Sequence, residues 1–311
     1  LAQKLLHRKG LTILSYHGVT KTPMPFEEWC FVEASQFRKH VSYLRDRFDL
    51  VPLSTAIQML DQGTIRRPTA VITFDDGFQN NYDIAFPVLQ EFNAPATIFL
   101  VTDRIGTDRT LWFCRIYMAL AETKITSLSW EGQRFNLTTP AGKAKASKWL
   151  QNAFKGLPFD RLLHELANLQ KILGVERDSP VSRNSPFRML DPTSIRTMKD
   201  SGLIEFGGHT HTHAILSRLT PDKQYEQITL SKHGVEQHTD LTCRFFAYPN
   251  GAPSDHDSTT TRILTHCGII AAVNMEHGLN YQDTHHLHLY RFGIGADTCF
   301  PRFKLMAHGF T

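Results

Sequence analysis

Short apolar runs that alternate with helical patterns constrain the fold of this chain more than any other sequence feature. The runs lie at residues 11–16, 71–74, 97–101, 203–206, 244–248, 269–273 and 287–292, and their length and apolar character are typical of buried strands. Between the first two runs, Phe37, Val41, Leu44 and Phe48 recur at the spacing of one helix face. Strands that alternate with helices predict a parallel sheet covered by helices, either open or closed into a barrel.

Helix start and stop signals support the same pattern. Asp191 followed by proline predicts a helix that ends at Gly202, and Thr220 followed by proline predicts one through about residue 235. A third predicted helix covers residues 259–267 and ends at Gly268.

One stretch, at about residues 111–189, breaks the alternation. It holds helical patterns at residues 141–154 and 160–173 but few strand candidates. We interpret it as a helical insertion that either forms part of a substrate cleft or only covers the barrel.

Composition narrows the classes of function. The 311 residues carry a formal charge of +4, and the basic residues are scattered, so no basic arm or stripe indicates a nucleic-acid partner. The five cysteines are widely spaced without a CxxC pair, which favours a reducing compartment over a disulfide framework. Residues 1–10 lack the apolar run of a signal peptide or membrane span, so we expect a cytoplasmic protein without a transmembrane segment.

Two acidic residues follow one predicted strand directly, in residues 71–77 (VITFDDG). The carboxyl ends of strands are the places where α/β folds bind ligands. Because adjacent carboxylates repel, one of Asp75 and Asp76 needs a proton, a cation or water beside it. A solvated Asp-Asp-Gly turn is the alternative.

Histidines follow another predicted strand, in residues 207–213 (GGHTHTH). His209 and His213 are four residues apart, so one helical turn would place both rings on one side while His211 points away. Two imidazoles at that spacing are common ligands of Zn²⁺ and similar ions; a histidine-rich surface loop is the alternative. Together with one carboxylate they would give three protein ligands and leave room for water, as in catalytic metal sites.

A third segment, residues 245–251 (FFAYPNG), predicts a strand that ends in a tight turn. In this turn Pro249 fixes the backbone, and the N–H of Asn250 is a candidate oxyanion donor. Taken by itself, the segment is more simply understood as a turn without function.

These three segments, in this order, resemble the motifs of the polysaccharide deacetylase (NodB-homology) family, carbohydrate esterase family four. Residues 15–19 (SYHGV) and 289–294 (LYRFGI) resemble the first and last strands of the branch that acts on bacterial surface polysaccharides, and residues 87–89 (PVL) with 95–99 (PATIF) resemble the segment after the first motif. The resemblance covers about residues 11–311 apart from the insertion. It implies one domain over residues 1–311, folded as a distorted (β/α) barrel of about seven parallel strands.

The resemblance also implies a hydrolase that removes N-acetyl groups from amino sugars of a glycan, with a divalent metal cofactor, most simply Zn²⁺. Asp75 would be the catalytic base, Asp76, His209 and His213 the metal ligands, and the Asn250 N–H an oxyanion donor. The metal would polarise the amide and activate its bound water.

This sequence departs from the family pattern in its third motif, where many members have Arg in place of Ala247 and Tyr in place of Asn250. Arg291, from another strand, is a candidate to orient the base instead. The general acid is expected to be His286 or His288, and we favour His288. We expect His17, Tyr248 and Pro249 to line the substrate site.

Two other functions fit the same residues. One is a metal amidohydrolase or O-deacetylase acting on a different acyl group, and the other is an inactive glycan-binding protein of the same fold. No GxSxG elbow or phosphate-binding GxxxxGK[ST] loop occurs in the sequence. The sequence does not determine the glycan or the oligomeric state.

Overall fold

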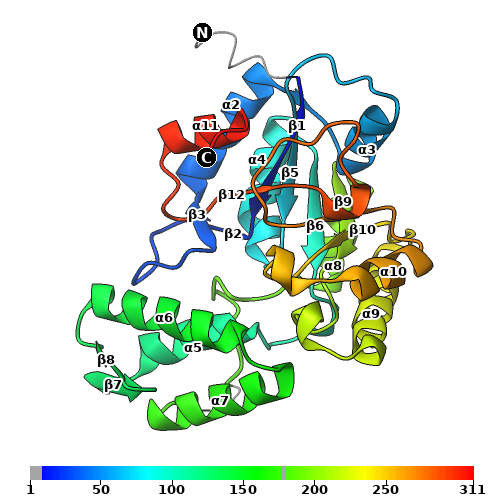
Figure 1. Cartoon of the computed structure of the whole chain (residues 1–311). Helices are drawn as coiled ribbons and strands as arrows, with labels where there is room; N and C mark the ends of the chain where they lie inside the picture. The colour runs from blue at the N-terminus through cyan, green and yellow to red at the C-terminus, as the bar shows by residue number, and fades with distance from the viewer. Residues whose placement is uncertain (1–8, 177–178) are drawn as a thin grey trace.

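The computed structural model describes residues 9–176 and 179–311, and its centre is a curled parallel sheet (Figure 1). Along the sheet the strands run in the order β11, β10, β9, β6, β5, β1, β12, and β4 also pairs with β5; all these pairings are parallel. The bounds are β1 Leu11–Tyr16, β4 Asp49–Leu50, β5 Thr69–Phe74, β6 Ala96–Leu100, β9 Ile204–Gly208, β10 Phe245–Ala247, β11 Ala271–Val273 and β12 Phe292–Gly293. The predicted parallel sheet of about seven strands is therefore confirmed.

The central strands are buried on both faces, which explains why they appear in the sequence as continuous apolar runs. In β1 and β5, Leu14 and Ile72 belong to the larger core cluster, whereas Ile13 and Val71 belong to a second cluster that includes helix α3 (Leu53–Asp61). Successive side chains of a strand point to opposite faces, so the two clusters lie on opposite sides of the sheet.

Further helices cover the sheet (Figure 1). They are α2 Ala34–Arg47, α4 Phe86–Glu91, α8 Pro192–Asp200, α9 Pro221–Thr239, α10 Ser258–His266 and α11 Phe300–Ala307. The predicted start of α8 is confirmed, because the Asp191 side chain accepts a 2.8 Å hydrogen bond from the N–H of Ser194. Thr220 stands at the N-cap of α9 but makes no side-chain capping bond.

The strand expected at residues 287–292 is largely absent. A 3₁₀ turn at His286–His288 precedes it, and only β12 pairs with β1 in its place. Asn280 explains part of the interruption: its side chain accepts a hydrogen bond from the N–H of Tyr290 and donates one to the carbonyl of the same residue. The backbone N–H and carbonyl of Tyr290 thus form their hydrogen bonds with a side chain instead of with a neighbouring strand.

The insertion forms a separate layer beside the sheet (Figure 1). It contains α5 Trp112–Glu122, β7 Ser127–Trp130, β8 Gln133–Asn136, α6 Pro140–Lys155 and α7 Phe159–Ile172. The antiparallel β7–β8 hairpin was not expected, although Leu128 and Trp130 are buried while Ser127 and Ser129 are exposed, as in a half-buried strand.

The insertion packs against a loop that joins two short strands near the sheet. Two short strands, β2 (Gly18–Thr20) and β3 (Phe31–Glu33), form a parallel pair. Phe26 and Cys30, from the loop between them, belong to the same core cluster as the helices of the insertion. The insertion therefore shares its core with the loop that follows β2.

Two predictions from the sequence concern the location of the protein: that it is cytoplasmic and that it has no transmembrane segment. The fold decides neither of them. Residues 1–8, most of the segment taken to lack a signal peptide, lie outside the described residues. Within residues 9–176 and 179–311, no helix has the length and apolar character needed to cross a bilayer.

Candidate active site

The three sequence motifs meet at the carboxyl ends of their strands. Asp75 and Asp76 follow β5, His209 follows β9 and Tyr248 follows β10. Because all three strands are parallel, their carboxyl ends lie at one edge of the sheet, where ligands bind in α/β folds. Segments more than a hundred residues apart in the chain are therefore neighbours here.

Asp76, His209 and His213 form a compact group of possible metal ligands, and each of the three offers an atom within 4.8 Å of the other two. The Nε2 atoms of His209 and His213 lie 3.6 and 3.3 Å from Oδ1 of Asp76. His211 is not a member, because its Nδ1 lies 2.9 Å from the Thr102 hydroxyl.

The two histidines do not reach this arrangement through a helical turn, as the spacing had suggested. Thr210 and His213 have positive φ values of 59° and 61°, and the segment is irregular. Asp76, with φ of 74°, is left-handed as well. Non-glycine residues seldom adopt this conformation, and backbone strain of this kind clusters at functional sites.

A backbone acceptor fixes the orientation of His209. Its Nδ1 lies 2.7 Å from the carbonyl oxygen of Ala247. A carbonyl can only accept a hydrogen bond, so Nδ1 carries the proton and the lone pair of Nε2 is directed at Asp76. Imidazole ligands of metals are usually held in this way.

The surroundings of Asp76 fit a cation. The residue is 1% exposed, and neither carboxylate oxygen has a hydrogen-bond partner among the described residues. Burial lowers the pKa of His209 to about 4, so this imidazole is neutral at pH 7. Burial alone would raise the pKa of Asp76, but the interaction with His213, followed by smaller ones with His17 and His209, outweighs it and keeps the pKa below its ordinary value. An ionised, unpaired carboxylate in the interior is costly without a positive partner, and a divalent metal would supply one.

Arg291 occupies the position expected of the residue that orients the base. Its Nη1 and Nη2 donate hydrogen bonds of 2.7 and 2.8 Å to the two oxygens of Asp75, and its Nε donates one of 2.8 Å to the carbonyl of Asn274. Arg291 is fully buried. Burial raises the pKa of Asp75, but the Arg291 charge outweighs that effect, so the carboxyl pKa lies well below its usual range.

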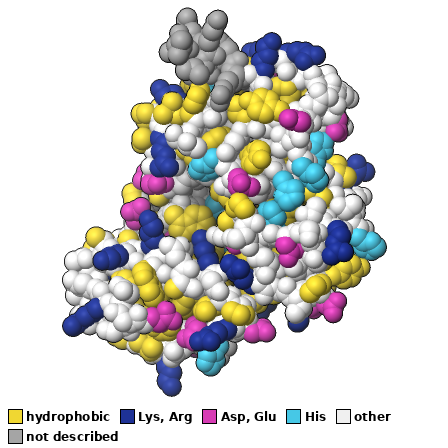
Figure 2. Space-filling model, viewed as in Figure 1, with side chains coloured by type: hydrophobic (Ala, Val, Ile, Leu, Met, Phe, Trp, Pro, Cys, Tyr) yellow, Lys and Arg dark blue, Asp and Glu magenta, His cyan; other side chains and the backbone are white. Residues whose placement is uncertain are grey.

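A cavity of about 190 Å³ opens beside these groups. Figure 2 shows a hollow between the sheet and the insertion, with hydrophobic side chains inside it. Of the expected residues, Asp75, His209, His213, His17, Tyr248 and Asn250 line the cavity. Asn250 has φ of 62°, its side chain donates a hydrogen bond to Asp255, and its own N–H donates none within the part of the chain that the structure describes.

Four expected site residues do not line this cavity: Asp76 and Arg291, which contact residues of its wall, and Pro249 and His288. Pro249 is buried beside it. His288 lies at the end of the 3₁₀ turn and lines a second cavity together with His256 and Thr261. Tyr248 lines the first cavity and stacks on His256, with 4.0 Å between ring centroids, so its ring lies between the two cavities. The predicted inward direction of His288 is thus wrong, because it assumed a strand that does not form.

His17 is in a better position than His288. It lines the site cavity and meets the ring of Trp29 edge-on at 4.7 Å between centroids. Burial lowers its pKa, whereas the charges of Asp76 and Asp75 act in the opposite direction. His17 therefore lies within the electrostatic reach of both acids.

Sequence reasoning missed half of the cavity wall. These residues come from the β2–β3 loop, the insertion and other loops: Trp29, Trp112, Phe113, Lys155, Ile215 and Met275. No motif or spacing marks them, since only the tertiary packing of the insertion and of the loops after the strands brings them to the site.

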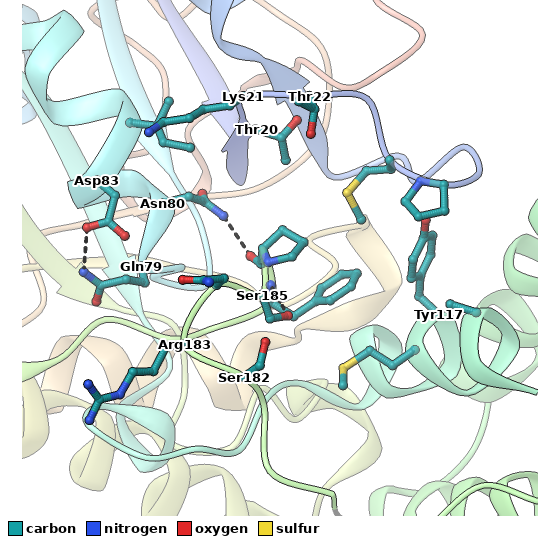
Figure 3. Close-up of a pocket in the computed structure, with 18 of the residues that line it drawn as sticks. Thr20, Lys21, Thr22, Gln79, Asn80, Asp83, Tyr117, Ser182, Arg183 and Ser185 are labelled. Atoms are coloured by element: carbon teal, nitrogen blue, oxygen red, sulfur yellow. Dashed lines mark hydrogen bonds between the residues drawn. The ribbon is translucent and has the colours of Figure 1, made fainter.

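A larger cavity, of about 660 Å³, lies between the β2–β3 loop, the segment after Asp76 and the insertion (Figure 3). Its polar side chains include pairs that satisfy one another or the backbone: Gln79 donates to Asp83, and Asn80 donates to the carbonyl of Pro186 (Figure 3). None of the three possible metal ligands lines it. The smaller cavity is therefore the stronger candidate for chemistry.

Comparison with known proteins agrees with this geometry. The family model for polysaccharide deacetylases matches residues 62–272, more than half of the chain, and the chain belongs to this family. It is 34% identical over 119 residues to the poly-beta-1,6-N-acetyl-D-glucosamine N-deacetylase of Staphylococcus epidermidis, and 31% identical over 98 residues to YxkH of Bacillus subtilis, a candidate polysaccharide deacetylase. These matches cover 34% and 31% of this chain, and 41% and 33% of the two relatives.

Solved structures confirm the fold. IcaB from Ammonifex degensii superposes with a TM-score of 0.62 at 21% identity, over 97% of this chain and 98% of that one. The distorted barrel expected from the sequence is therefore the fold of this chain.

Proposed function

We propose that this protein is a metal-dependent N-deacetylase that removes acetyl groups from amino sugars of a polysaccharide or oligosaccharide. The observation that carries the proposal is the group of Asp76, His209 and His213 beside the Arg291-bound carboxylate of Asp75. Membership of the polysaccharide deacetylase family and the similarity to a poly-N-acetylglucosamine N-deacetylase support the same substrate class.

Asp76, His209 and His213 would hold the metal, for which Zn²⁺ suits two imidazoles and one carboxylate; cobalt, nickel, manganese or iron also suit them. Such an ion supplies Lewis acidity to the acetamide carbonyl and lowers the pKa of water.

Asp75 is the base in this proposal. Arg291 keeps its carboxylate ionised and holds its plane fixed, so the carboxylate can accept a proton from the attacking water. Oδ1 keeps a further lone pair beside the one that Arg291 occupies, whereas Oδ2 also accepts a 3.5 Å hydrogen bond from the Ser15 hydroxyl.

Two other residues complete the chemistry. The N–H of Asn250, held by its left-handed backbone, donates to the oxyanion of the tetrahedral intermediate. His17 protonates the departing amine, because it lines the cavity and His288 does not. The step requires the imidazolium form of His17, which burial disfavours and the charges of Asp76 and Asp75 favour.

The alternative of an inactive glycan-binding protein loses its main support. It was favoured by the absence of arginine from the third motif, and Arg291 now makes the contacts that such an arginine was expected to make. An O-deacetylase would use the same groups, so substrate comparison distinguishes it.

The test is release of acetate and free amine from N-acetylglucosamine oligomers by the full chain loaded with Zn²⁺. Asp75→Asn should lower kcat by about 10²- to 10⁴-fold while the metal content stays the same. Asp200→Asn, at an exposed acid in α8, is the matched control and should keep full activity.

Full activity of Asp75→Asn would show that the base is assigned wrongly. Release of acetate from O-acetylated but never from N-acetylated sugars would favour the O-deacetylase.

A further inference from the structure

Lys155 is a cation at the edge of the site cavity, and no carboxylate among the described residues lies close enough to form an ion pair with it. It is the last residue of α6, it is half-buried, and it lines the cavity together with Asp75 and His209. Its Nζ lies 5.6 Å from the ring centroid of Trp29. Within the described residues it makes no ion pair or hydrogen bond. Burial lowers its pKa, and the more distant charges of Asp255 and Glu28 act in the opposite direction.

The same helix also holds Trp29 in place. The indole Nε1 of Trp29 donates a 2.8 Å hydrogen bond to Oε1 of Gln151, one turn before Lys155. Gln151 is fixed in turn, because its Nε2 donates hydrogen bonds to Glu28 and to the Ser147 hydroxyl. The direction of the Trp29 ring is therefore set by the insertion.

Trp29 is suited to contact a ligand. It is 41% exposed although it lines the cavity. Its ring meets the ring of His17 edge-on. The Lys155 ammonium lies over this ring and lines the same cavity as Asp75. A flat aromatic face with a cation beside it provides apolar contact area and a charge for a sugar that carries an acid group.

A simpler reading of Lys155 is that it complements the C-terminal end of the α6 dipole and contacts Trp29 through a cation–π interaction. Both interactions would be available to a lysine fully exposed at the surface. They do not account for placing an ammonium group partly out of water in a cavity lined by aromatic rings, where no carboxylate forms an ion pair with it and burial of the charge is unfavourable.

We propose that the insertion builds a second sugar subsite next to the deacetylation centre, in which Trp29 packs against an acidic sugar and Lys155 pairs with its carboxylate. This inference rests on the proposed N-deacetylase function. The preferred substrate is then a glycan in which N-acetylated amino sugars alternate with uronic acids.

The test compares two oligosaccharides of equal length, one of N-acetylglucosamine alone and one in which it alternates with glucuronate. The wild-type chain should have the higher kcat/KM on the acidic oligomer, and added salt should reduce that preference. Lys155→Gln should reduce the preference about tenfold, and Lys155→Arg should largely restore it. Lys148→Gln, an exposed lysine on the same helix, is the matched control and should leave the preference unchanged.

Calorimetric binding of both oligomers to the same proteins separates this inference from the proposed function. If neither oligomer is deacetylated, the N-deacetylase proposal fails, and tighter binding of the acidic oligomer that Lys155→Gln abolishes would still support the subsite. Measurable but equal turnover of the two oligomers by the wild type, or equal binding of them, would overturn it. An equal loss on both oligomers in Lys155→Gln would also overturn it.

Discussion

At the scale of single residues, the pair of Asp75 and Arg291 decides the state of the proposed base. Both side chains are buried, and they share two hydrogen bonds in a fork geometry. Lysine cannot reproduce that geometry, because its three N–H donors share one nitrogen on a flexible stem and do not form a planar fork.

Arg291→Lys should therefore keep the charge but lose the fixed orientation of Asp75. We expect kcat to fall by about ten- to a hundredfold, with a lower thermal midpoint, measured by acetate release and by calorimetric unfolding. Arg302→Lys, at an exposed pair with Asp297, should change neither quantity. Unchanged kcat in Arg291→Lys would contradict the positioning role of Arg291.

The choice of proton donor gives a second prediction at this scale. His17→Gln should lower kcat by about 10²-fold or more, because no other histidine outside the metal-ligand group lines the cavity in the described residues. His288→Gln should stay within about twofold of the wild type, since Tyr248 lies between His288 and the site. The opposite ranking of the two variants would return the acid role to His288.

Several site residues could be predicted from the sequence, and the reason is topological. Asp75, Asp76 and His209 directly follow apolar strands, and parallel strands bring their carboxyl ends together. His288 could not be placed, because alternating polar and apolar residues at 286–289 suit a strand as well as the 3₁₀ turn that forms. Trp29 and Lys155 carry no local signal, since only tertiary packing brings them to the cavity.

At the scale of elements, the contact between α6 and the β2–β3 loop depends on a buried acid. Glu28 is 3% exposed and accepts hydrogen bonds from Gln151 and Ser147. Burial raises the pKa of Glu28 from 4.5 to about 7, although these hydrogen bonds oppose the shift. Between pH 4.5 and pH 7 the Glu28 carboxyl binds more protons in the folded state than in the unfolded state. Its contribution to the free energy of unfolding therefore falls as pH rises toward 7 and is constant above pH 7.

Glu28→Gln should remove this pH dependence, because the amide resembles the protonated acid. Relative to the wild type, the variant should gain at most about 2–3 kcal/mol of unfolding free energy between pH 5 and pH 8. Denaturant unfolding at both pH values measures the gain, and Glu27→Gln, at the exposed neighbouring acid, should show none. A difference between Glu28→Gln and the wild type that is the same at both pH values would contradict the buried, proton-binding role.

Helices and strands could be predicted from the sequence where a capping residue, a glycine or a clear apolar pattern marks their bounds. Asp191 caps α8 and Gly202 follows its end, as expected from residue type and position. The β7–β8 hairpin was missed because its strands are short and only one face is buried, so they resemble a polar loop in the sequence. Its turn at Glu131 and Gly132 takes positive φ at both residues, a geometry that glycine favours in tight hairpins.

At the scale of the whole molecule, the barrel and the insertion have different parts in the proposed function. The barrel brings together Asp75, Asp76, His209 and His213 from distant segments. The insertion contributes Trp112, Phe113 and Lys155 to the cavity wall. We therefore expect chemistry to depend on the barrel and the choice of glycan to depend on the insertion.

The central claim is that Asp76, His209 and His213 hold one divalent ion. Its most direct test is an anomalous difference map from crystals of the Zn²⁺-loaded protein, recorded for the wild type and for His213→Ala. We predict one strong peak in contact with an Asp76 oxygen and with Nε2 of both histidines, and loss of that peak in His213→Ala. No peak in the wild type, with the Asp76 carboxylate turned away from both imidazoles, would contradict the account.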